Sequence, residues 1–178
     1  EQCTADAVGA KISIAEVERV GSHLPLNKAP GPDRIPNGFY KTFIKLLAPL
    51  MAAAFNEAQD SGDGIKGFKD GIVAILYKKG TRTDIRNYRP ITLLNGDYKL
   101  LTRILAKRML TIVSQFVDEA QIGFMPRTFI AEATTLLKLL QTHLDHIDEG
   151  GIAVALDFEK AFDKCSWSYL KKAIKALK

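Results

Sequence analysis

IAVALDFEKAFD, the stretch over residues 152–163, follows a glycine pair and carries five apolar residues before its first carboxylate. A short continuous apolar run after Gly-Gly is typical of a strand that is buried on both faces. Asp157 then stands where the strand meets its loop, a position at which folds that mix helices and strands place ligand and metal chemistry. The pattern predicts a buried strand over residues 152–156 and, further on, a helix over residues 168–177.

The two aspartates of this stretch each have a structural and a functional interpretation. Asp163 is most simply a helix N-cap or a first-turn acid, because free backbone N–H groups favour an acid there. Asp157 is either a solvated acid at a strand end or a ligand for Mg²⁺, an ion that prefers hard oxygen ligands. One carboxylate does not make a two-metal site, which needs further acids from elsewhere.

Composition places the chain among ordinary globular proteins of one domain or slightly more, with 178 residues, 47% of them hydrophobic and 25% charged. Cys3 and Cys165 have no metal-type spacing, which indicates free thiols in a reducing compartment. No apolar run approaches the length of a membrane span and no signal peptide is evident. We therefore expect an intracellular protein of the nucleus or cytoplasm, neither secreted nor in a membrane. The first residue is Glu1 and the last lies in a helical pattern, so we expect both ends to continue in a longer chain.

The net charge of +5 is unevenly distributed. Residues 66–111 contain eleven Lys or Arg against three Asp, so this block alone carries +8. A basic block beside a slightly acidic remainder suggests a surface for a polyanion, with nucleic acid as the first candidate. The alternative is a solvated charged face without a ligand.

The rest of the chain is predicted to alternate helices with one hairpin. Ser13 and Glu16 have the spacing of a capping box that opens a helix, and three prolines in residues 27–36 exclude regular structure there. Residues 70–80 and 88–95 are predicted strands joined by a basic loop. Further helices are expected over residues 98–117 and 131–147, the second with a leucine-rich core face, and over residues 37–60. For that last helix the predicted core-facing residues are Phe39, Phe43, Leu46, Leu47, Leu50, Met51, Ala54 and Phe55.

Five motifs in this order resemble those of reverse transcriptases from non-LTR (LINE-type) retrotransposons. They are NKAPGPDRIP (residues 27–36), ILYKKG (75–80), NYRPITLLN (87–95), QIGFMPR (121–127) and LDFEKAFD (156–163) with Trp167. The resemblance extends from about residue 12 to the end of the chain. Arg34 stands where the family usually has Gly, and one usual Gly is missing between Pro126 and Arg127. If the backbone at residue 34 needs a positive φ, Arg would strain it.

The resemblance implies an α+β fold, with reverse-transcriptase-like fingers and the first strand and helix of an incomplete palm. The expected divisions are a helical lead-in over residues 1–26, a fingers-like region over 27–147 and the start of the palm over 148–178. Family members copy RNA into DNA: a primer 3′-OH attacks the α-phosphate of a dNTP, with Mg²⁺ stabilising the reacting oxygens. The implied partners are an RNA template, a DNA primer, the dNTP and the remaining palm and thumb of a parent chain.

The resemblance also assigns roles to individual residues. Asp157 is implied as the catalytic metal ligand, and Phe158 as a second metal contact through its carbonyl. Phe162 is implied as the steric gate against a ribose 2′-OH, although core packing alone also accounts for a phenylalanine there. Implied nucleotide contacts are Arg89 and one of Lys78 and Lys79, and weaker implied nucleic-acid contacts are Arg82, Arg86, Gln121, Gly123, Phe124 and Arg127.

The family's second catalytic motif, an aromatic-Ala-Asp-Asp sequence, does not occur in these 178 residues. We therefore expect that the chain alone does not extend a primer. The apolar stretch at residues 152–156 would also lack strand neighbours, and an exposed edge of this kind tends to pair with other chains. Self-association is the expected result. The alternatives to a polymerase fragment are a non-catalytic basic module that binds nucleic acid and a degraded copy of a retroelement.

Overall fold

The computed structural model describes residues 8–62, 64–68, 70–118, 120–126, 128–147, 150–157 and 164–176. It divides into two compact units, Glu1–Ile112 (unit 1) and Val113–Lys178 (unit 2). The described residues combine helices with one two-stranded antiparallel sheet, so the predicted mixture of helix and strand is confirmed.

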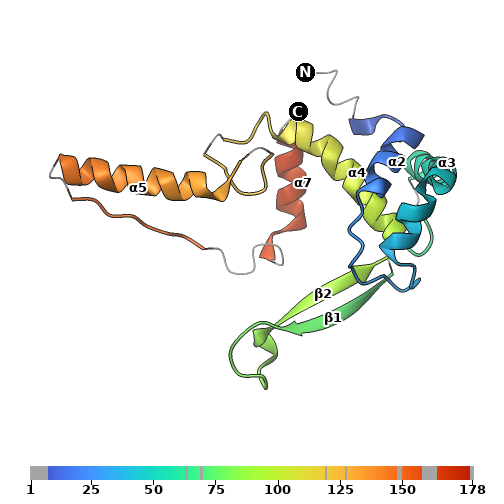
Figure 1. Ribbon diagram of the computed structural model, residues 1–178, viewed down its shortest axis with the longest axis horizontal. Coiled ribbons are helices and arrows are strands. Elements are labelled where there is room, and N and C mark those ends of the chain that lie inside the picture. The colour runs from blue at the N-terminus through green and yellow to red at the C-terminus, as the bar shows by residue number, and fades with distance from the viewer. Residues whose placement is uncertain are drawn as a thin grey trace. The chain divides into compact units, whose positions relative to one another are not determined.

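Unit 1 contains the elements that the sequence predicts, in the predicted order (Figure 1). They are α2 (Ile14–Ser22), α3 (Asn37–Ser61), β1 (Gly71–Tyr77), β2 (Tyr88–Leu94) and α4 (Gly96–Val113). The predicted basic loop between the strands also contains a short helix, η1 (Ile85–Asn87), that the sequence did not predict. The capping box at α2 is confirmed, because Ser13 Oγ accepts from the Glu16 amide and the Glu16 carboxylate accepts from the Ser13 amide. Each helix contributes one apolar face to a common core. The buried core residues are Ile12, Val17, Val20, Leu24, Tyr40, Ile44, Ala48, Ala52, Phe55, Phe68, Leu100 and Ile104.

The predicted core face of α3 is confirmed only in part. Phe55 is buried, and Leu47 and Met51 pack against the core, whereas four of the eight predicted residues are exposed. Helix α3 instead buries the series Tyr40, Ile44, Ala48, Ala52 and Phe55. Both series keep helical spacing, so α3 has two apolar faces, and periodicity alone does not say which one packs inward. The predicted residues that remain exposed are Phe39, Phe43, Leu46 and Leu50.

Helix α3 is also the one helix among the described residues that is long and apolar enough, by length and composition, to cross a membrane. Lys41 and Lys45 interrupt its apolar residues, so no continuous apolar run of that length is visible in the sequence. Its buried face lines the core of unit 1, and about a third of its most apolar window is buried there.

The proline-rich loop packs against the end of β2. Gly31 is buried, and a Cβ on it would lie 2.4 Å from the amide nitrogen of Asn95. The Asp33 amide donates to Asn95 Oδ1 over 3.2 Å, and the Asp33 carboxylate accepts from the Ile35 amide. The loop therefore joins the start of α3 to the junction between β2 and α4.

Arg34 adopts a φ of 60°, inside this same loop. Its amide donates to the Gly31 carbonyl over 3.0 Å, which closes the turn. A left-handed backbone costs a residue with a Cβ about 1–2 kcal/mol. The strain foreseen for Arg at this position is confirmed, and it explains why a glycine suits the turn better.

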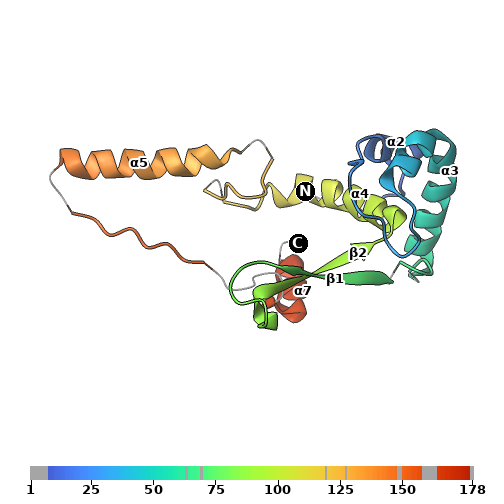
Figure 2. The same ribbon diagram turned by 60° about the horizontal axis from the view of Figure 1, so that its bottom comes forward.

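The hairpin is a regular ribbon whose strands pair from Gly71↔Leu94 to Tyr77↔Tyr88. It projects from the helices of unit 1, with the basic loop at its free end, in Figures 1 and 2. Most of its side chains are exposed on both faces. The predicted hairpin is confirmed, with strand ends within a few residues of the prediction.

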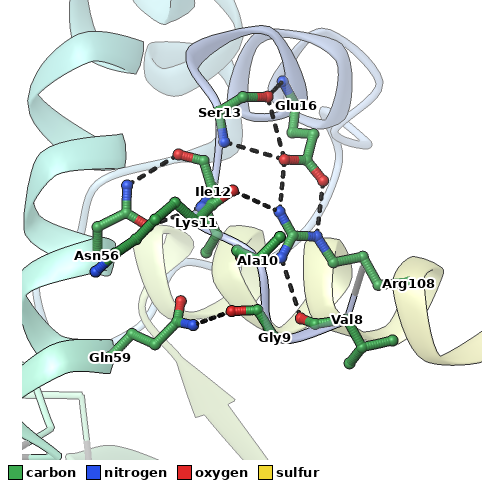
Figure 3. A network of polar contacts seen from close by, with 10 residues as sticks. All are labelled: Val8, Gly9, Ala10, Lys11, Ile12, Ser13, Glu16, Asn56, Gln59 and Arg108. Carbon is green, nitrogen blue, oxygen red and sulfur yellow. Dashed lines mark hydrogen bonds and ion pairs between the residues drawn. The ribbon is translucent and has the colours of Figure 1, made fainter. Parts of the chain in front are cut away.

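Arg108 of α4 holds the N-terminal segment and α2 in place (Figure 3). Its Nε and Nη2 donate to the two carboxylate oxygens of Glu16 over 2.8 and 2.7 Å. Its remaining N–H groups donate to the carbonyls of Val8, Ala10 and Lys11. All five donors of the guanidinium are thereby used. Arg108 is therefore a structural residue, although the sequence places it on the basic face of its helix.

Side chains of α3 clamp the same segment from the other side (Figure 3). Asn56 pairs with the backbone of Ile12, accepting from its amide over 2.7 Å and donating to its carbonyl over 2.9 Å. Gln59 donates to the Gly9 carbonyl, and Lys11 forms an ion pair with Asp60. The segment over residues 8–12 is thus part of the folded unit.

The Glu16–Arg108 pair predicts a pH dependence of stability. The hydrogen bond from Arg108 lowers the pKa of Glu16 from its ordinary value of 4.5 to about 2. Because the pKa is lower in the folded state, this contribution is complete above pH 4.5 and is lost as the pH falls towards 2. When the pH is lowered from 5 to 3, the midpoint of urea unfolding should decrease in the unmodified chain. In Glu16→Gln, which has no carboxyl at this position, the decrease should be smaller. Equal falls in both proteins would contradict the assignment.

Unit 2 contains the helices α5 (Ile130–His146) and α7 (Trp167–Ala176), both at predicted positions. The expectation that α5 has a core face is wrong, because none of its described residues is buried. Its exposed leucines are Leu136, Leu137, Leu139 and Leu140.

The prediction of a buried strand over residues 152–156 is also wrong. Residues 150–157 have no regular secondary structure, and Ile152 and Leu156 are 94% and 84% exposed. A strand needs a neighbour for its backbone N–H and C=O groups. Among the described residues no strand pairs with this stretch, so an apolar run alone did not suffice to predict its structure.

Candidate nucleotide and nucleic-acid interface

Three side chains organise the loop at the tip of the hairpin. Tyr77 and Tyr88 face each other at the last strand pair, with ring centroids 5.6 Å apart. The Tyr77 hydroxyl donates to the Gly80 carbonyl over 2.6 Å, and the Tyr88 hydroxyl donates to the Arg82 carbonyl over 2.8 Å. Between them, Asn87 Nδ2 donates to the Thr81 carbonyl over 2.8 Å. We call these three residues, Tyr77, Asn87 and Tyr88, the carbonyl clasp.

The strand register separates the two candidate lysines. Arg89 lies directly opposite Leu76, and the Lys78 amide continues the ladder by donating to the Asn87 carbonyl over 2.8 Å. Side chains alternate between the faces of a strand, so Lys78 projects to the face of Leu76 and Arg89. Lys79 follows in the turn. Lys78, Lys79 and Arg89 are exposed, and none of them forms an ion pair within the described part of the chain.

Arg82 and Arg86 have different surroundings. The Arg82 guanidinium lies 4.9 Å from the centroid of the Tyr77 ring, a cation–π contact that leaves its donors open to solvent. Arg86 is bound to Asp84 through Nε and Nη2, and its hydrogen bonds lower the pKa of that carboxyl. The charge of Arg86 is therefore already paired, which makes it a weaker phosphate ligand than the sequence suggests.

The loop over residues 120–126 belongs to unit 2 and presents an aromatic ring. Phe124 is 92% exposed and has a φ of 64°. Gln121 Nε2 donates to the Gly123 carbonyl over 3.0 Å, and Thr128 Oγ1 donates to the carbonyls of Ile122 and Met125. Strained backbone of this kind is often found at functional sites. Arg127 lies outside the described residues.

Asp157 is exposed at the end of the irregular stretch in unit 2. Its carboxylate is the right kind of donor for a divalent cation. However, the described residues contain no group of three Asp, Glu, His or Cys side chains that would complete a metal site. Phe158, Phe162 and Asp163 lie outside the described residues, so their predicted roles stay predictions.

The carbonyl clasp and the role of Arg108 are absent from the sequence-based candidates. A signal for the clasp was present, because Asn87 and Tyr88 directly precede Arg89 and Tyr77 directly precedes the lysine pair. No sequence signal distinguishes Arg108 from Arg103 or Lys107 on the same helix, since all three are basic residues within one amphipathic pattern.

Comparisons with known proteins support the interpretation of the motifs. Residues 76–178 match the family described as reverse transcriptase (RNA-dependent DNA polymerase). The RNA-directed DNA polymerase from mobile element jockey of Drosophila melanogaster is 30% identical over 86% of the chain and 17% of its own length. The "Transposon TX1 uncharacterized 149 kDa protein" of Xenopus laevis is 28% identical over 93% of the chain and 13% of its own length.

A third relative is the Pol polyprotein of the type-2 retrotransposable element R2DM from Drosophila melanogaster, which is 24% identical over 92% of the chain. The chain belongs to the reverse transcriptase family, and its resemblance to the non-LTR branch is confirmed. It spans less than a fifth of the length of these relatives. Reverse transcriptase domains generally use divalent metal ions and act on nucleic acid with nucleotide substrates.

Proposed function

We propose that this chain is the fingers and the start of the palm of an RNA-directed DNA polymerase, with the divisions predicted from the motifs. Its tasks are to hold the dNTP by its phosphates and to contact the RNA template beside a DNA primer. Asp157 supplies one ligand for a divalent ion, and the described residues do not complete that metal site. The chemistry of nucleotidyl transfer therefore depends on carboxylates beyond those described.

One observation supports this proposal: Arg89 lies opposite Leu76 in the ladder, and the Lys78 amide continues the ladder by donating to the Asn87 carbonyl, which favours one common face for Lys78 and Arg89. Arg grips phosphate oxygens with two donors, and Lys adds a point charge beside it. Lys78, rather than Lys79, is therefore the proposed phosphate ligand. Arg82, stacked and unpaired, is a proposed contact to the template backbone, together with Gln121, Gly123, Phe124 and Arg127 in unit 2.

Nucleotide binding tests the proposal on the chain itself. We expect Arg89→Ala and Lys78→Ala to weaken binding of a fluorescent dATP by about tenfold each, because each loses a charged contact to phosphate. Lys79→Ala should change the affinity by about threefold at most. Arg103→Ala removes the same charge from an exposed position on α4 and serves as the control.

The possible outcomes separate polymerase from binding module. Equal losses for Lys78→Ala and Lys79→Ala would contradict the assignment from the register. Salt-dependent binding of RNA without any binding of dATP would favour a non-catalytic module over a polymerase fragment.

Self-association is a second expectation under this proposal. Residues 152–156 expose alternate apolar side chains without a strand neighbour among the described residues, and such stretches pair with other chains. Val154→Lys should lower the sedimentation mass towards the 19.7 kDa of one chain. Leu46→Lys makes the same kind of change on the exposed face of α3. If Leu46→Lys lowers the sedimentation mass more than Val154→Lys does, the chain associates through the exposed face of α3 instead.

A further inference from the structure

We propose that the backbone amides of Lys79–Thr83 form an anion-binding cradle for phosphate, and that the carbonyl clasp positions it. This inference rests on the proposed function and adds to it a set of main-chain ligands and three positioning residues. Nothing in the motifs assigns a role to these amides.

The hydrogen bonds of the loop divide its polar groups into two sets. The consecutive carbonyls of Gly80, Thr81 and Arg82 all accept from clasp side chains. The amides of residues 79–83, in contrast, donate no hydrogen bond to any described part of the chain, whereas the next amide, of Asp84, donates to the Thr81 carbonyl. Three of the five carbonyls of residues 79–83 are therefore occupied within the described part of the chain, whereas all five amides are free to donate.

The charges around the loop also favour binding of an anion. Lys78 precedes the free amides, and Lys79 and Arg82 lie among them. The one acid of the loop, Asp84, is bound by Arg86 through two N–H groups. Gly80 has a φ of 93°, and its Cα lies so close to Asn87 that a Cβ would be 2.6 Å from Nδ2. Consecutive free amides beside cations are the components of anion-binding loops. The chemistry that fits them is a phosphate group.

Two sources provide such a group: the triphosphate of a nucleotide and the backbone of a template strand. Titration of the ¹⁵N-labelled chain with sodium tripolyphosphate, and separately with oligouridylate, distinguishes them. We expect a saturable downfield shift of the Lys79–Thr83 amides with tripolyphosphate. A shift with oligouridylate alone would keep the cradle and assign it to the template backbone.

Tyr88→Phe tests the positioning role without changing any charge. Loss of one hydroxyl-to-carbonyl hydrogen bond should weaken tripolyphosphate binding about fivefold, as read from the loop amides. Unchanged amide signals for Gly71–Tyr77 would show that the hairpin itself is intact. Tyr169→Phe, at an exposed tyrosine of α7, is the matched control and should leave the affinity unchanged.

Several results would overturn the cradle. If tripolyphosphate shifts the Arg89 side-chain N–H and neither ligand shifts the loop amides, the cradle is wrong while the proposed function stands. If neither ligand shifts the loop amides or the Arg89 side-chain N–H, the cradle and the proposed phosphate contact of Arg89 are both wrong. If Tyr88→Phe binds tripolyphosphate as tightly as the unmodified chain does, the carbonyl clasp has no role in phosphate binding.

Discussion

Arg108→Ala is expected to lower the free energy of unfolding of unit 1 by about 3 kcal/mol. The Arg108 and Glu16 side chains are 11% and 20% exposed, so the ion pair is largely shielded from water. Removing the guanidinium leaves a nearly buried carboxylate unpaired and three carbonyls, of Val8, Ala10 and Lys11, without their donor. Leaving the shielded carboxylate of Glu16 without its cation costs more than the net value of the ion pair itself.

Urea unfolding at pH 7 measures this loss, and Arg103→Ala is the matched control. Arg103 lies on the same helix with an exposed side chain, and it forms no hydrogen bond or ion pair within the described residues. Its substitution should change stability by less than about 0.5 kcal/mol. If the two variants differ by less than about 1 kcal/mol, Arg108 is not the anchor of the N-terminal segment.

Gly31→Ala is expected to destabilise unit 1 by about 3 kcal/mol. The added Cβ would lie 2.4 Å from the Asn95 amide nitrogen and 2.5 Å from the Leu94 carbonyl carbon. Both are backbone atoms at the end of β2, so no side-chain rotation relieves the overlap. The loop over residues 27–36 must therefore move away from the hairpin, and the hydrogen bond that the Asp33 amide donates to Asn95 Oδ1 is lost.

Gly38→Ala makes the same chemical change with the opposite expected sign. Gly38 lies in the first turn of α3, and its added Cβ would meet only Leu26, at 3.8 Å. Alanine is favoured over glycine in a helix by up to about 1 kcal/mol. Thermal unfolding of the two variants should therefore shift in opposite directions. A neutral Gly31→Ala would show that the contact with β2 is not tight.

Local signals in the sequence were sufficient for the elements of unit 1. The capping box at Ser13, the prolines around Gly31 and the two apolar stretches beside the basic loop each have a direct local cause. The faces of helices were harder to predict. Helix α3 has two apolar series, and only the positions of α2 and α4 decide that the series with Tyr40 and Ile44 packs inward.

The candidate site was predictable in its residue types but not in its pairings. Arg86 is an implied nucleic-acid contact in the sequence and Arg108 belongs to the same basic block, but both are bound by carboxylates, of Asp84 and Glu16. Such pairings depend on which chain segments meet in space, which composition does not reveal. The proposal of Lys78 over Lys79 as the phosphate ligand likewise depends on the strand pairing, which the sequence alone does not give.

The proline-rich loop contacts the base of the exposed ribbon, where Gly31 and Asp33 meet Asn95. The seven-residue strands extend about 20 Å from this contact to the tip. A rotation of the ribbon by about 5° about this contact would move the cations at the tip by about 2 Å, more than half the length of a hydrogen bond. A change in the proline-rich loop would therefore displace the proposed phosphate ligands, although the loop carries none of them.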